Sequence, residues 1–160
     1  MPDNADKIIL NISLYIYCTS TKVTRYFPGI PSFSVSHRIL SSLRVCAILT
    51  PQAVQAGNMV FVSGQLPIDP ATGEFAGDDI KSQTRQSLTN VKNILASEGV
   101  EMSQILRVGV FMKDMNMFAD MNAVYGEFFE KDFPARAAVE VARLPKDALV
   151  EIEAVACTDK

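Results

Sequence analysis

The sequence has no tryptophan and only one histidine, His37. A metal site built from several histidines is therefore excluded, and a Ser-His-Asp or Cys-His centre would have to use that residue. His37 lies in the least regular part of the chain, so we give it little weight. The three cysteines, Cys18, Cys46 and Cys157, are far apart and form no C-x-x-C pair. Their spacing favours free thiols in a reducing compartment over a zinc or redox site.

The chain also lacks a long apolar run and a surplus of basic residues. No stretch reaches the ~18 apolar residues that a membrane-spanning helix needs, so we expect no membrane segment. The net charge is −3, whereas a dedicated nucleic-acid binder usually has a concentrated basic face. Nucleic acid is therefore disfavoured as a partner. A hydrophobic share of 48% and a charged share of 21% are typical of a soluble globular protein.

Acidic residues are absent between Asp6 and Asp69, and the first 50 residues are rich in Ser, Thr and basic side chains. This composition is typical of an organelle transit peptide. The apolar run at residues 8–18 resembles a diluted signal-peptide core, and a poorly ordered extension is the third interpretation. We therefore separate an unassigned N-terminal extension, residues 1–50, from a domain at residues 51–160. We expect a cytoplasmic protein, or one imported into mitochondria or plastids if the extension is a transit peptide.

From residue 52 onward the hydrophobic pattern becomes regular. Residues 59–62 (MVFV) indicate a strand, and the Pro and Gly of residues 69–73 (DPATG) predict a turn that closes a hairpin. A helix is expected from Asp78 or Asp79 to Gly99, because apolar residues recur there at steps of three and four. The residues of this stripe are Ile80, Thr84, Leu88, Val91 and Leu95.

The second half of the domain continues the alternation of strands and helices. Residues 105–112 (ILRVGVFM) predict a buried strand, and a second helix is expected to begin near Asn116. Two further strands, 136–142 and 149–156, complete the order β-β-α-β-α-β-β. The pattern predicts an α+β fold in which two helices cover one face of a mixed sheet. The core face of the second helix is expected to consist of Phe118, Met121, Tyr125 and Phe128.

The last two strands carry charges between small residues. In strand 136–142 the alternation separates Arg136 and Glu140 from an apolar face, and in strand 149–156 it separates Glu151 and Glu153 from another apolar face. We expect both apolar faces to pack under the helices, and both half-polar faces to meet another subunit in a symmetric oligomer. The apolar face of the first of these strands consists of Ala137, Val139 and Val141.

Arg136 is the natural candidate to bind a small carboxylate. Its planar guanidinium donates two parallel hydrogen bonds to two oxygens and stays charged at every relevant pH. A nearby carboxylate such as Glu151 could orient or deprotonate a water molecule. The alternative is that Arg136 and one of the glutamates form a cross-strand ion pair, and periodicity alone favours this simpler interpretation.

Several ordered segments of the domain resemble a single family. They are GNMVFVSGQLP (57–67), DPATGE (69–74), QTRQSL (83–88), VFMKDM (110–115), MNAVY (121–125) and PARAAVEVARLPKDALVEIEAVA (134–156). On these motifs, residues 52–157 are identified as a member of the reactive-intermediate deaminase family, also called Rid or YjgF. Residues 1–50 resemble nothing in that family.

The resemblance implies a chorismate-mutase-like α+β fold and a homotrimer with clefts between subunits. It also implies a hydrolase that needs no metal or cofactor. Such an enzyme would convert reactive 2-imino or 2-enamino acids, such as 2-aminoacrylate, 2-iminopropanoate and 2-iminobutanoate, to 2-keto acids and ammonia. Its partners would be this small imino or keto acid and two further copies of the chain.

The same resemblance assigns roles to individual residues. Arg136 would hold the substrate carboxylate, and Glu151 would position the attacking water. Ser63 of the S-G-Q motif, Asn122 in the second helix and the backbone at Ala138 would contact the substrate.

The chain departs from the family pattern at two places. Ala137 and Ala138 stand where Ser-Cys or Ser-Thr usually follow the arginine, so only backbone groups remain for contact there. The cleft tyrosine that usually precedes the first glycine is missing near Thr50 and Pro51. This absence puts the substrate range or the rate in question.

Two other functions stay open at this point. Some family members carry the label of RNA-cleaving translation inhibitors, which the acidic net charge and the lack of a histidine pair disfavour. A non-enzymatic ligand sensor would need Arg136 but has less need of Glu151. The presence of both residues therefore favours an enzyme.

Overall fold

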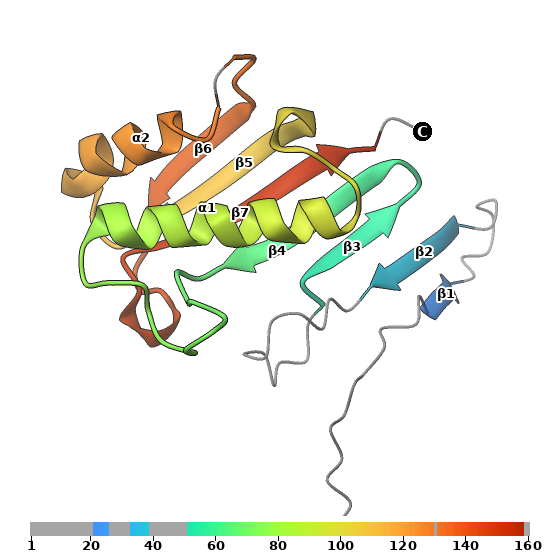
Figure 1. Cartoon of the computed structure of the whole chain (residues 1–160), viewed down its shortest axis with the longest axis horizontal. Coiled ribbons are helices and arrows are strands. Elements are labelled where there is room, and N and C mark those ends of the chain that lie inside the picture. The colour runs from blue at the N-terminus through green and yellow to red at the C-terminus, as the bar shows by residue number, and fades with distance from the viewer. Residues whose placement is uncertain (1–20, 26–32, 39–50, 130, 159–160) are drawn as a thin grey trace, which may run out of the picture.

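The computed structural model describes residues 21–25, 33–38, 51–129 and 131–158 (Figure 1). Its strands are β1 (Thr21–Arg25), β2 (Phe33–Arg38), β3 (Ala53–Ala56), β4 (Met59–Gln65), β5 (Ile105–Met112), β6 (Ala135–Glu140) and β7 (Val150–Cys157). They form one sheet with the order β1-β2-β3-β4-β7-β5-β6. Helices α1 (Ile80–Ser97) and α2 (Phe118–Gly126) both lie on one face of this sheet (Figure 1). The predicted α+β class is confirmed.

The sheet is mixed because β5 and β6 pair in parallel, whereas the other described neighbours are antiparallel. β1 and β2 lie inside the segment 1–50, which we left unassigned, and β2 pairs with β3. The apolar run 8–18, Cys18, Cys46 and the side chain of His37 lie outside the described residues. The interpretation as a targeting segment and the cytoplasmic location stay predictions.

The hairpin at the start of the domain closes at a different turn from the one predicted. β3 and β4 are joined at Gly57-Asn58, where Gly57 has a φ of 62°. A left-handed conformation of this kind suits glycine in a two-residue hairpin turn. The turn at residues 69–73 does form, but it closes only a single bridge between Ile68 and Phe75.

Helix α1 begins and ends where the sequence predicts. Asp79 caps it by accepting hydrogen bonds from the backbone N–H groups of Lys81 and Ser82. Gly99, with a φ of 70°, follows its last turn. The predicted apolar stripe, Ile80, Thr84, Leu88, Val91 and Leu95, is buried along its whole length.

Helix α2 begins at Phe118, two residues later than predicted, because a short 3-10 turn at Met115–Met117 precedes it. Its predicted core face is confirmed. Met121 and Tyr125 are buried, and Phe118 and Phe128 pack against the core. Neither α1 nor α2 has the combination of length and apolar character that crossing a bilayer requires.

The face assignment of β6 was wrong. In the register of β5 and β6, Val108 lies beside Arg136 and Val110 beside Ala138. Both valines are buried in the core under the helices, so Arg136 and Ala138 face the helices as well. The opposite face carries Val139, which is 45% exposed. Alternation shows which residues share a face but not which face is covered, and at an edge strand a long arginine can lie along its apolar surroundings.

Two buried amides fasten α1 to the loops around it. Gln83, which is 3% exposed, donates to the carbonyl of Gly77 (2.9 Å) and accepts from the N–H of Leu149 (2.8 Å). Asn90 donates to the carbonyls of Leu66 and Ile68. Because Leu149 directly precedes β7, the Gln83 amide links the start of α1 to the strand that carries Glu151.

Replacing Gln83 with Met should keep the volume of the side chain and leave two buried backbone groups unpaired. We expect the free energy of unfolding to fall by about 1–3 kcal/mol, measured by urea denaturation. The control is Gln86→Met, because Gln86 is less buried and donates one hydrogen bond, to Asn90. Equal losses for the two variants would contradict this role of Gln83.

Candidate active site

The arginine half-site consists of Arg136, Asn122 and Ala138 and lies where α2 crosses β6. Nη1 of Arg136 donates to Oδ1 of Asn122 at 2.8 Å. The guanidinium carbon lies 4.4 Å from the centre of the Tyr125 ring. Ala138 follows on the same face of the strand and packs against the core. The structure thus brings three of the five predicted site residues together.

The glutamate half-site consists of Glu151, Gly64 and Ser63, from β7 and β4. A β-bulge between Val62 and Gln65 places Ser63 and Gly64 opposite a single residue of β7. The carboxylate of Glu151 lies over Gly64, so that a Cβ atom at position 64 would come within 2.0 Å of Oε1. The hydroxyl of Ser63 donates to the carbonyl of Pro51 at 2.7 Å.

The surroundings of Glu151 disfavour the ionised form of its carboxyl group. Its partial burial, and then the negative charge of Glu153, raise the pKa of the Glu151 carboxyl above its ordinary value. Glu153 lies over Gly109 and forms an ion pair with Arg107 at 3.6 Å. A carboxyl with a raised pKa is a better proton acceptor than an ordinary surface glutamate, once it is ionised.

The two half-sites project from opposite faces of the sheet. Val150 and Ile152, the neighbours of Glu151 in β7, are fully buried under the helices, so Glu151 points to the uncovered face. Arg136 points to the helix face. Our prediction that the charged faces of the two strands coincide was therefore wrong, and one copy of the chain cannot place Arg136 and Glu151 around one small molecule.

The uncovered face of the sheet also carries apolar side chains. Phe61 lies beside Val155, and Phe111 lies beside Val139 in the sheet register. Phe61 and Val139 are each 45% exposed. Apolar groups of this size that share an open sheet face are typical of a surface that another protein covers.

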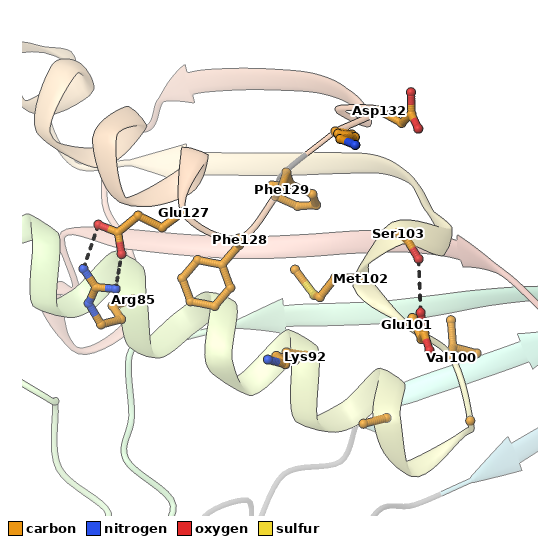
Figure 2. Close-up of a pocket in the computed structure, with 13 residues that line it drawn as sticks. Arg85, Lys92, Val100, Glu101, Met102, Ser103, Glu127, Phe128, Phe129 and Asp132 are labelled. Carbon is orange, nitrogen blue, oxygen red and sulfur yellow. Dashed lines mark hydrogen bonds and ion pairs between the residues drawn. The ribbon is translucent and has the colours of Figure 1, made fainter.

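A hollow of about 960 Å³ lies apart from both half-sites. Figure 2 shows it between α1, the segment that follows α2 and the 3-10 turn at Met102–Gln104. At one end Arg85 donates to both carboxylate oxygens of Glu127. None of the five predicted site residues lines this hollow. Its size alone is therefore no reason to place the active site there.

Sequence reasoning missed three residues of the site. Gly64 was quoted only as part of a motif, and its close contact with Glu151 has no signal in the sequence. Tyr125 and Phe118 were interpreted as core residues, although their spacing from Asn122 places all three on one face of α2.

Thr50, where the family's cleft tyrosine is missing, lies outside the described residues. In the part of the chain that the structure describes, no group of three or more His, Cys, Asp or Glu side chains could hold a metal ion.

Gly64→Ala should displace the Glu151 carboxylate. Gly64 has no positive φ, so the strain comes from the contact with Glu151 and not from the backbone. We expect a loss of about 1–3 kcal/mol in the free energy of unfolding. In a Glu151→Ala background the same substitution should cost much less, which a double-mutant cycle measures. Additive effects would show that Glu151 does not occupy the space over Gly64.

Comparisons with known proteins show which family the chain belongs to. The model of the family described as endoribonuclease L-PSP matches residues 44–158. A RutC family protein of Pyrococcus horikoshii is 57% identical over 105 residues, which are 66% of this chain and 83% of that protein. A 2-iminobutanoate/2-iminopropanoate deaminase of Salmonella typhimurium is 52% identical over 108 residues, 66% of this chain and 84% of that protein.

The fold has solved relatives as well. The crystal structure of E. coli TdcF with bound serine is 43% identical to the chain and has a TM-score of 0.71. The match covers 76% of this chain and 98% of that one. The match to the family model spans residues 44–158 and begins slightly earlier than the resemblance at residues 52–157 indicated. The chain belongs to the endoribonuclease L-PSP family, the Rid or YjgF family that its motifs resemble.

Proposed function

We propose that this protein is a cofactor-free deaminase that hydrolyses reactive 2-imino acids to 2-keto acids and ammonia. The observation that carries the proposal is the arginine half-site. Arg136 has five N–H donors, and among the described residues Asn122 alone accepts from it. The remaining donors suit a carboxylate. The deaminase name of relatives about half identical to the chain supports the same substrate class.

The reaction needs little from the protein. The carbon of a protonated imine is already electrophilic, so a water molecule can add to it without a metal. Arg136 holds the carboxylate, while Glu151 accepts a proton from the water and later returns one to the departing nitrogen. The C–O bond forms and the C–N bond breaks, and the hydroxyl proton passes to the departing ammonia, so that the 2-keto acid and an ammonium ion are released. Holding the substrate and the water in line supplies most of the rate gain.

Glu151 must come from a second copy of the chain in this mechanism. The uncovered sheet face, with Phe61 and Val139, is the surface on which the copies would meet. A closed ring of three copies would form three equivalent sites, each with the arginine half-site of one copy and the glutamate half-site of its neighbour. Ser63 would then lie at the second copy's side of the cleft, and the backbone at Ala138 at the first.

Two alternatives are weaker. RNA cleavage is suggested by the family's description as an endoribonuclease, but the site presents one guanidinium and no described histidine side chain for acid–base catalysis. A ligand sensor would use the arginine half-site without turnover. Degradation of RNA that survives purification and is lost in Arg136→Ala would support the first, and binding without turnover the second.

The deaminase proposal can be tested with a coupled assay. The protein is added to a threonine or serine dehydratase, and keto-acid formation is followed. We expect the wild type to accelerate it and Arg136→Ala to reduce that acceleration about 100-fold, because the carboxylate loses its anchor. The control is Arg85→Ala, an exposed arginine that pairs with Glu127 away from both half-sites. No acceleration by the wild type would refute the proposal.

The shared site can be tested by mixing two inactive variants. Arg136→Ala retains the glutamate half-site, and Glu151→Gln retains the arginine half-site. Refolded together in equal amounts, they should recover roughly a quarter of the wild-type activity, since each site then has a one-in-four chance of two intact halves. Sedimentation should show three copies. Activity that does not exceed that of the separate variants would contradict a site shared between copies.

A further inference from the structure

Three side chains on one face of α2 contact the guanidinium of Arg136. Phe118, Asn122 and Tyr125 are spaced i, i+4 and i+7, which places them in a row on the helix. The guanidinium carbon of Arg136 lies 5.5 Å from the centre of the Phe118 ring and 4.4 Å from that of Tyr125. Between these two rings along the helix, Asn122 accepts the hydrogen bond from Nη1.

The two rings form a floor under the guanidinium, and Tyr125 within it is buried, although Arg136 itself is exposed. Tyr125 is only 3% exposed, and its ring packs against Phe129 with 4.7 Å between the ring centres. Its hydroxyl is buried and has no hydrogen-bond partner among the described residues. Tyr125 therefore contributes its ring, and the ring faces a cation that is attracted to the aromatic π-system.

We infer that Tyr125, supported by Phe118, is a positioning residue that holds Arg136 in the orientation that binds a substrate carboxylate. The inference deepens the proposed function and rests on it for the identity of the ligand. An arginine side chain without such contacts adopts many rotamers, and ligand binding would have to restrict it to one of them at a cost in conformational entropy. Stacking on Tyr125 fixes one face of the guanidinium, and Asn122 fixes one edge. The other edge then remains for two parallel hydrogen bonds to a carboxylate.

Tyr125→Leu removes the ring and keeps an apolar side chain, whereas Tyr125→Phe keeps the ring and removes only the unpartnered hydroxyl. We expect Tyr125→Phe to behave like the wild type. Tyr125→Leu should bind 2-oxobutanoate, a stable 2-keto acid, about tenfold more weakly by calorimetry. In the coupled assay it should raise KM more than it lowers kcat, because the carboxylate anchor acts on bound substrate and transition state alike. Phe133→Leu is the control, since Phe133 is 63% exposed and contacts Phe129 instead.

Nitrogen NMR of the arginine side chains gives a second readout that does not depend on activity. The Arg136 signal, assigned by its loss in Arg136→Lys, should be shifted by the ring currents of Tyr125 and Phe118. The shift should persist in Tyr125→Phe and largely disappear in Tyr125→Leu. The signal of Arg143, which pairs with Asp147, should stay in place.

The outcomes separate the two proposals. An unchanged Arg136 signal and unchanged affinity in Tyr125→Leu would overturn the positioning role. If that variant fails to fold, Phe118→Leu should show the same changes at smaller size, and no change there would also overturn the role. A wild type that neither binds 2-oxobutanoate nor accelerates keto-acid release would refute the deaminase. The NMR shift would then still decide whether α2 holds Arg136.

Discussion

Successive side chains of a strand point to opposite faces of the sheet, and the functional logic of this protein depends on that constraint. β6 and β7 are separated by β5 alone, and the register through β5 is continuous from Arg107 to Met112. It places Arg136 beside Val108 under the helices and Glu151 beside Phe111 on the uncovered face. No side-chain rotation moves a group through a hydrogen-bonded sheet. A reaction that needs both residues therefore needs two copies of the chain.

The two faces prepare their charged groups by different means. On the helix face, the guanidinium of Arg136 is held by aromatic rings and an amide from α2. On the uncovered face, Glu151 and Glu153 lie over Gly64 and Gly109, where any side chain would collide with them. Arg136 is thus oriented by direct contacts, whereas Glu151 and Glu153 are accommodated in space that the two glycines leave open. Both arrangements direct a charge to the protein surface, where a neighbouring copy in the proposed trimer would reach it.

The fold followed from local patterns, whereas the site followed only in part. The stripe from Ile80 to Leu95, the cap at Asp79 and the strand at residues 105–112 each depend on spacing that a sequence displays directly. Which side chains of β6 face the core depends on which side of the sheet α2 covers. The six-residue sequence of this edge strand does not indicate that side. Motif resemblance named Arg136, Asn122, Ala138, Ser63 and Glu151 individually as candidates. Their division into two half-sites required the register of the sheet.

The raised pKa of Glu151 connects folding with assembly. Because burial and Glu153 raise this pKa, the folded copy binds a proton there more tightly than the unfolded chain does. The stabilisation that results is complete below the unfolded pKa and is lost as the pH rises through the folded pKa. An ionised Glu151 at neutral pH is thus unfavourable in a single copy. In the proposed trimer, the guanidinium of a neighbouring copy would favour the ionised form and lower that pKa. The contact that completes the site would then also remove the electrostatic cost of keeping its proton acceptor ionised.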